Sequence, residues 1–175
     1  MLLLMKDIYK ILKIIQTNMK QTTCCYMIKN HQYLMLYRNK KKDDPNHHKW
    51  IGVGGKVEPN ETIEECMKRE INEETGLQAN TLMFRGVVYF TYPNANEKIY
   101  LFTCDDFEGN MHESDEGTLQ WIAQTDVLNL DLWEGDKVFL RRLLQKDLSL
   151  FCYELEYDEC GKLIKVSEKE VESYE

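Results

Sequence analysis

At residues 54–77 the chain reads GGKVEPNETIEECMKREINEETGL, a glycine turn followed by a short segment rich in carboxylates. Thr62 is a favourable helix N-cap, and Glu65 occupies the capping-box position three residues later. Gly76 is a residue type on which helices commonly end. The stretch therefore predicts a helix of about four turns over residues 62–75.

The predicted helix places carboxylates beside its packing face. At about 100° per residue, Glu70 and Glu74 point within about 20° of the apolar stripe, and Glu73 lies at its edge. Partly buried like charges are costly unless they are paired, and Arg69 cannot neutralise them all. A hard divalent cation such as Mg²⁺ could neutralise these carboxylates, because it prefers carboxylate and phosphate oxygens. An acidic, solvated helix after a glycine turn is the other interpretation. The apolar stripe on the packing face of the predicted helix consists of Ile63, Met67 and Ile71.

Length and charge set limits on the class of protein. The 175 residues suggest one domain, and a hydrophobic fraction of 43% can supply its core. The net charge of -8 does not favour binding to nucleic acid polymers or to anionic membranes. Residues 1–50 carry +7 and residues 51–175 carry -15. A basic segment beside an acidic metal site would suit a polyphosphate, although solvated surface explains the asymmetry equally well.

The cysteines and the N-terminus indicate a cytoplasmic protein. None of the six cysteines forms a CxxC pair, so free thiols in a reducing compartment are expected. Residues 1–20 are too short and too charged to span a bilayer, and they lack a small-residue cleavage site. They form either an amphipathic helix, with Leu4, Ile8, Ile11 and Ile15 on one stripe, or a stretch upstream of an alternative start at Met19. We treat residues 1–20 as an extension of uncertain role and residues 21–175 as the domain.

The remaining segments predict an α+β fold. Strands and helices do not alternate as regular βαβ units, so a mixed sheet is favoured over a doubly wound one. Polar loops are expected at 38–49 and 105–117. The expected strands are 21–28 and 33–37 as a hairpin, 82–92, 98–104, 119–123, and a terminal hairpin of 150–157 and 162–166. A second helix is expected at 136–145, a turn or short helix at 126–130, and a frayed end at 167–175.

The spacing of the opening stretch resembles the Nudix box. Gly55 is followed after five residues by Glu61, after seven more by Arg69-Glu70-Ile71, and then by Glu73-Glu74 and Gly76-Leu77. Every restricted position is filled, which is very improbable by chance. The resemblance implies the Nudix α/β/α sandwich, with a mixed β-sheet between helices.

Flanking segments resemble the MutT/MutX-type 8-oxo-dGTP diphosphatases within this superfamily. The segments are residues 50–58, residues 113–116 with Trp121, and residues 132–136, and the likeness covers residues 22–166. It implies that water attacks a phosphorus of an oxidised purine nucleoside triphosphate, releasing the monophosphate and pyrophosphate, and that the enzyme cleans the nucleotide pool. It also implies a nucleotide as partner and a monomer or homodimer.

The resemblance assigns residues to the reaction. The Gly54 carbonyl, Glu70 and Glu74 match metal ligands for Mg²⁺, with Mn²⁺ possible. Glu73 matches a position that is linked to the metal or orients the water, and Glu116 matches an extra acidic ligand or general base. Which of Glu73, Glu74 and Glu116 takes the proton is left open. Lys56 and Arg38 are candidate phosphate contacts, with solvated charge as the alternative. Arg69 and Glu61 match a structural pair.

Base recognition departs from the subgroup. The human member has an Asn after the Trp that precedes the glycine loop, where this chain has Ile51. It also has two adjacent acids, which here match Gly135 and Asp136. Trp133 is expected to stack on a purine or to pack in the core, and Asp136 to accept a hydrogen bond from the base.

Two other functions remain open. One is a pyrophosphatase acting on ADP-ribose or another nucleoside diphosphate derivative. Such enzymes tend to carry a proline about fifteen residues after the box, and Pro93 lies near that place. The other is a nucleotide-binding regulator without catalysis, which the intact acidic residues of the box disfavour.

Overall fold

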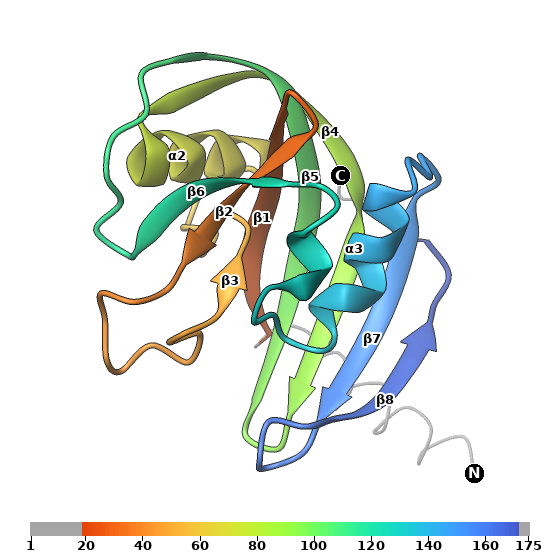
Figure 1. Ribbon diagram of the computed structural model, residues 1–175. Coiled ribbons are helices and arrows are strands. Elements are labelled where there is room, and N and C mark those ends of the chain that lie inside the picture. Colours follow the sequence, from red (N-terminus) through yellow and green to blue (C-terminus); the bar gives the residue numbers. More distant parts are fainter. Residues whose placement is uncertain (1–18, 172–175) are drawn as a thin grey trace, which may run out of the picture.

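The computed structural model describes residues 19–171 (Figure 1). The amphipathic stripe expected at the N-terminus, and residues 172–175 of the expected frayed end, lie outside the described residues. The helices are α2 Ile63–Thr75, the 3₁₀ turn η1 Val127–Asn129 and α3 Asp136–Leu144. The strands are β1 Lys20–Lys29, β2 Gln32–Tyr37, β3 Trp50–Ile51, β4 Leu77–Tyr92, β5 Ala95–Gly109, β6 Thr118–Ala123, β7 Phe151–Tyr157 and β8 Leu163–Glu168.

The sheet is mixed, as the α+β interpretation predicted. Its strands follow the order β3-β2-β1-β5-β4-β7-β8, and β6 pairs with β2 outside this path. Strands β1 and β5 run parallel, as do β4 and β7, whereas the hairpins β4–β5 and β7–β8 are antiparallel. The expected first hairpin is confirmed, but β1 pairs with β2 only near the turn, at Ile28 and Lys29.

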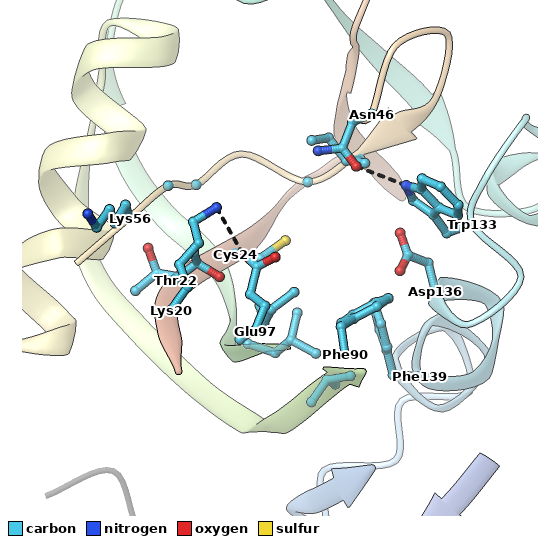
Figure 2. A pocket seen from close by; sticks show the side chains of 18 of the residues that line it. Lys20, Thr22, Cys24, Asn46, Lys56, Phe90, Glu97, Trp133, Asp136 and Phe139 are labelled. Carbon is cyan, nitrogen blue, oxygen red and sulfur yellow. Dashed lines mark hydrogen bonds and ion pairs between the residues drawn. The ribbon is translucent and has the colours of Figure 1, made fainter. Parts of the chain in front are cut away.

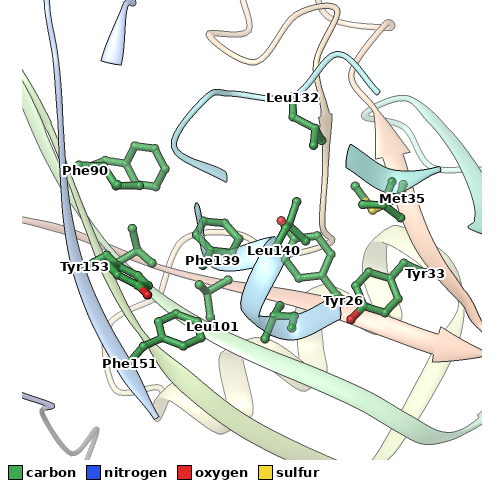
Figure 3. Close-up of a cluster of buried hydrophobic side chains, with 14 of the residues drawn as sticks. Tyr26, Tyr33, Met35, Phe90, Leu101, Leu132, Phe139, Leu140, Phe151 and Tyr153 are labelled. Carbon is green, nitrogen blue, oxygen red and sulfur yellow. The ribbon is translucent and has the colours of Figure 1, made fainter. Parts of the chain in front are cut away.

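Two helices cover opposite faces of the sheet (Figure 1). Successive strand residues point to opposite faces. Accordingly Val87 joins one apolar cluster with Met67 and Ile71 of α2, and Val88 joins another with Phe139 and Leu140 of α3. Figure 3 shows the second cluster, in which aromatic side chains from β1, β4 and β7 surround α3. The expected sandwich of a mixed sheet between helices is thus confirmed.

The helix after the glycine turn has the predicted ends. Thr62 accepts a hydrogen bond from the backbone N–H of Glu65, and the Glu65 carboxylate accepts one from the Thr62 N–H. This reciprocal capping box satisfies donors at the helix start. Gly76 closes the helix with φ 78°, and its N–H donates to the Asn72 carbonyl. Local chemistry alone therefore sets where α2 begins and ends.

Two strands are longer than the sequence predicted. The hairpin β4–β5 continues beyond the expected 82–92 and 98–104, so that Leu77 pairs with Gly109 and part of the expected loop at 105–117 is strand. This distal end is largely exposed and carries polar side chains, such as Asn80 and Thr81, both of which donate to the Asp106 carboxylate. Leu77, Ala79 and Phe107 of this end pack against the apolar cluster that contains Met67, but exposed polar residues separate them and the ladder has register shifts, so no regular alternating pattern marks the strands in the sequence.

No helix among residues 19–171 is long and apolar enough to cross a membrane. Residues 167 and 168 of the expected frayed end belong to β8.

Candidate active site

The glycine loop lies directly against the carboxylates of α2. The Gly54 N–H donates to Oε2 of Glu74 at 2.9 Å. A Cβ at Gly54 would stand 2.0 Å from the Thr23 carbonyl oxygen, and one at Gly55 would stand 2.4 Å from the Glu70 carboxyl carbon. Both contacts are far inside van der Waals distance, so only glycine allows β1 and α2 to approach the loop this closely.

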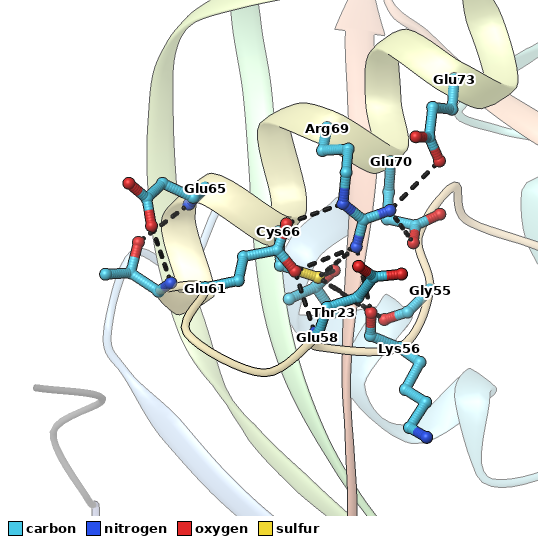
Figure 4. A network of polar contacts seen from close by, with 11 residues as sticks. Thr23, Gly55, Lys56, Glu58, Glu61, Glu65, Cys66, Arg69, Glu70 and Glu73 are labelled. Carbon is cyan, nitrogen blue, oxygen red and sulfur yellow. Dashed lines mark hydrogen bonds and ion pairs between the residues drawn. The ribbon is translucent and has the colours of Figure 1, made fainter.

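Arg69 joins the helix to the loop (Figure 4). Its guanidinium donates to both Glu61 oxygens at 2.7 and 3.0 Å, to the Lys56 carbonyl at 3.1 Å and to Oε1 of Glu70 at 2.6 Å. These hydrogen bonds hold the pKa of Glu61 down to about 2. The pair expected between Arg69 and Glu61 is present in the structure, and its two-pronged geometry orients the loop on α2.

Glu74 is the most buried of the acidic residues in the box. Burial raises its pKa to about 8, and the nearby carboxylates of Glu70 and Glu116 add to the rise against the opposing effects of the Gly54 N–H and Arg38. Burial also raises the pKa of Glu70. Glu73 differs, because its side chain is 61% exposed and pairs with Arg69 at 3.1 Å. Two carboxylates therefore face the loop, and the third faces solvent.

Arg38, at the end of β2, connects several acidic residues. Its guanidinium contacts Oδ2 of Asp44 at 2.5 Å, Oε2 of Glu116 at 2.5 Å and Oε1 of Glu74 at 3.7 Å. Lys41 forms a second ion pair with Glu116. Arg38 thus lies among carboxylates, in addition to bordering the cavity where a phosphate contact was expected.

The donor set suits a hard divalent cation. No three His, Cys, Asp or Glu side chains within residues 19–171 converge tightly enough to hold an ion in their present arrangement. Arg38 contacts Glu74 and Glu116, and Arg69 contacts Glu70. Burial, with a smaller effect of the neighbouring carboxylates, raises the pKa of Glu74, and a nearby positive charge opposes both effects. Carboxylate oxygens of Glu70, Glu74 and Glu116, together with the Gly54 carbonyl, are ligands of the type that Mg²⁺ and Mn²⁺ accept.

A cavity of about 220 Å³ begins at the glycine loop and ends at α3. Figure 2 shows Lys56 and Thr22 at the end near α2, and Trp133 and Asp136 at the opposite end. Apolar residues from β4 and β5, including Phe90, form the wall between them. The exposed Lys56 side chain makes no ion pair with any residue from 19 to 171. The cavity thus has a cationic end beside the loop and an aromatic end with one acid.

The aromatic end holds its residues in defined positions. Trp133 packs edge-on against Tyr92 and Tyr157, and its Nε1–H donates to Oδ1 of Asn46 at 2.8 Å. Asp136, the first residue of α3, is 6% exposed, and burial raises its pKa to about 7. Trp133 therefore both packs against its neighbours and borders the cavity, combining the two roles that its sequence position suggested.

The structure brings most of the predicted site residues to one region. Glu70 and Glu74 lie against the glycine loop that contains Gly54, and Arg38 links Glu116 to Glu74. The cavity is bordered by Arg38, Lys56, Trp133 and Asp136. Sequence reasoning missed Asp44, Lys41 and Asn46, because they lie in the loop at 38–49, which was interpreted only as a solvated loop. Polar composition gave no signal that the loop folds back over the cavity.

Comparison with known proteins agrees with this geometry. The sequence model of the family described as NUDIX domain matches residues 19–143. An oxidized purine nucleoside triphosphate hydrolase from Mus musculus is 34% identical over 72% of this chain and 81% of its own length. One from Danio rerio is 37% identical over 56% of this chain and 64% of its own length. The crystal structure of a mutator MutT protein from Bacillus halodurans is 26% identical, with a TM-score of 0.77 over 86% of this chain and 97% of that chain.

Proposed function

The chain belongs to the NUDIX domain family, and from this membership we propose that it hydrolyses oxidised purine nucleoside triphosphates such as 8-oxo-dGTP to the monophosphate and pyrophosphate. The two relatives described as oxidized purine nucleoside triphosphate hydrolases support this substrate class. One structural observation carries the proposal. A single cavity joins an aromatic end with a buried acid to the glycine loop that lies against Glu74.

The shape of the cavity suggests how a nucleotide is held. A purine entering the aromatic end contacts Trp133 and meets the carboxyl group of Asp136. Its phosphates then extend toward Gly54 and Lys56, where the loop backbone can be approached closely. This direction places the phosphorus atoms beside the carboxylates of α2 and positions the substrate for attack by water.

We assign the chemistry to the acidic residues around the glycine loop. Glu70, Glu74, Glu116 and the Gly54 carbonyl would hold Mg²⁺ or Mn²⁺, and Nudix hydrolases generally use divalent metal ions. The bound ion would supply the positive charge that a phosphoryl transition state needs. Glu74, which lies directly against the glycine loop, is our candidate to accept a proton from the attacking water, and Glu73 or Glu116 is the alternative base.

We further propose that residues 21–175 act as one domain, with residues 1–20 as an extension, in the cytoplasm as a monomer or homodimer. The nucleotide is the partner, without a nucleic acid polymer or a membrane. The free thiols of all six cysteines fit a reducing compartment.

The decisive experiment is a substrate panel. The purified chain with Mg²⁺ is offered 8-oxo-dGTP, dGTP, ADP-ribose and dinucleoside polyphosphates, and the products are separated by chromatography. We expect 8-oxo-dGTP to give 8-oxo-dGMP and pyrophosphate. Running the reaction in ¹⁸O-labelled water identifies the attacked phosphorus, because the label enters only the product that contains it. Release of inorganic phosphate, or a clear preference for ADP-ribose, would contradict the proposal.

The ADP-ribose alternative receives no structural argument from Pro93. This residue lies in the tight turn between β4 and β5 and borders a different, open surface pocket with Ala95 and Gly161. It is not among the residues of the cavity that ends at the glycine loop. The substrate panel decides between the two candidates directly.

A further inference from the structure

One polar side chain at the base end of the cavity comes from the loop at 38–49. Asn46 borders the cavity together with Ile51, Trp133 and Asp136 (Figure 2). Its presence matters because Ile51 offers no side-chain hydrogen bond, so the position after Trp50 cannot read a base. Asn46 brings an amide to the same end of the cavity from a different segment of the chain.

The hydrogen bond to Trp133 determines which way this amide points. An indole N–H is a donor only, so the oxygen of the Asn46 amide must face it, as the 2.8 Å contact with Oδ1 shows. The amide nitrogen Nδ2 lies on the side away from the indole. It has no hydrogen-bond partner among residues 19–171. Two N–H donors are therefore available at the cavity wall.

The loop holds Asn46 firmly although it is long. The Asn46 backbone N–H donates to Oδ1 of Asp44 at 2.9 Å, and its carbonyl accepts from the Lys49 N–H at 2.8 Å. The Arg38 guanidinium in turn binds the other Asp44 oxygen. The Arg38 backbone N–H donates to the Lys49 carbonyl, which joins the two ends of the loop. The amide thus belongs to a hydrogen-bonded unit with a defined position, as selective recognition requires.

We propose that Asn46 is a base-reading residue that donates from Nδ2 to the O8 oxygen of an oxidised purine, while Asp136 accepts from the adjacent N7–H. The inference rests on the proposed function and adds a selectivity residue to it. Guanine presents bare acceptors at N7 and O6. Oxidation at C8 places a proton on N7 and a carbonyl oxygen beside it. A donor from Asn46 and an acceptor from Asp136, which line the same end of the cavity, therefore match the oxidised ring and not the normal one.

Three variants test this assignment. Asn46→Asp keeps an oxygen for the Trp133 N–H but removes both amide donors, and Asn46→Ala removes the oxygen as well. Asn39→Ala is the matched control, since Asn39 lies in the same loop, donates to Thr118 and does not border the cavity. For each protein kcat/KM is measured with 8-oxo-dGTP and with dGTP, and melting curves establish that the variant is folded.

We expect the ratio of 8-oxo-dGTP to dGTP turnover to fall about tenfold or more in both Asn46 variants and to stay unchanged in Asn39→Ala. The added charge of Asn46→Asp weakens both nucleotides alike, so the ratio removes that effect. If Asn46 only positions Trp133, Asn46→Asp will keep the wild-type ratio, and the assignment is overturned.

A binding measurement separates this inference from the proposed function. Calorimetry with 8-oxo-dGMP and dGMP needs neither metal nor turnover. A wild-type preference for 8-oxo-dGMP that disappears in Asn46→Asp supports the assignment even if the triphosphate is not hydrolysed. Equal binding of the two monophosphates to the wild-type protein overturns it, whatever the turnover results are.

Discussion

Replacing Asp136 by Asn should change how the stability of the protein depends on pH. Burial raises the pKa of Asp136 from 3.8 to about 7. A carboxyl group with a higher pKa in the folded state binds its proton more tightly there than in the unfolded chain. Its contribution to stability is therefore complete below about pH 4 and is lost progressively as pH rises toward 7. Above pH 7 this carboxyl group causes no further change in stability.

The size of this effect follows from the pKa shift. About three pKa units at ~1.36 kcal/mol each amount to roughly 4 kcal/mol. This is an upper bound, because water in the adjoining cavity can solvate the carboxylate. Asn has nearly the same shape as Asp and carries no charge. We therefore expect Asp136→Asn to match the wild-type stability near pH 4 and to exceed it by as much as about 4 kcal/mol at pH 8.

Urea unfolding at a series of pH values from 4 to 8.5 measures the difference between the two proteins. Other titrating groups contribute equally to both and cancel. Glu134→Gln is the control, since Glu134 lies two residues before Asp136 but is exposed and forms an ion pair with Lys137. Parallel stability curves for wild type and Asp136→Asn would refute the argument that burial opposes ionisation of this carboxyl group. In the substrate panel the same variant should also change the ratio of 8-oxo-dGTP to dGTP turnover, since it replaces the acid at the base end.

Four further changes have defined outcomes. Glu74→Gln should lower kcat by orders of magnitude while the protein stays folded, because Gln can still accept from the Gly54 N–H and carries no charge to bury; near-normal turnover would remove Glu74 from the site. Excess chelator should abolish hydrolysis, and activity that persists in it would end the metal assignment. Trp133→Ala should raise KM for all purine nucleotides together, whereas a change confined to one base would contradict stacking. Arg69→Lys should lower the melting temperature by a few degrees in calorimetry, since Lys cannot bind both Glu61 oxygens; an unchanged value would show that the pair is not structural.

The sequence predicted best those features that are set by neighbouring residues. The capping box at Thr62, the glycine C-cap and the burial of Met67 and Ile71 follow from residues within one helix. The same periodicity placed Glu70 and Glu74 beside the packing face, where the structure has them. It also placed Glu73 near that face, but the Glu73 side chain extends to solvent and pairs there with Arg69.

What the sequence did not reveal depends on contacts between distant segments. The parallel pairing of β1 with β5 joins residues such as Thr22 and Ile99, and no local pattern records it. The loop at 38–49 is polar throughout, so nothing distinguishes the solvent-facing residues from Asn46, which enters the cavity. The loop folds back on itself through a positive φ at His48 and through backbone hydrogen bonds between its two ends.

Arg38 shows why the two ends of the cavity cannot be interpreted separately. One guanidinium binds Asp44, which holds the turn that carries Asn46, and it also binds Glu116 and approaches Glu74. Although burial opposes it, the hydrogen bonds from Arg38 and from the Asn46 backbone lower the pKa of Asp44, which keeps this carboxylate charged. Removing the Arg38 side chain would release the loop at 38–49, which carries Asn46, and would leave the neighbouring carboxylates without their counter-charge. A loss of activity in such a variant would therefore not identify a phosphate contact, because the same loss follows from misplacing either end of the nucleotide.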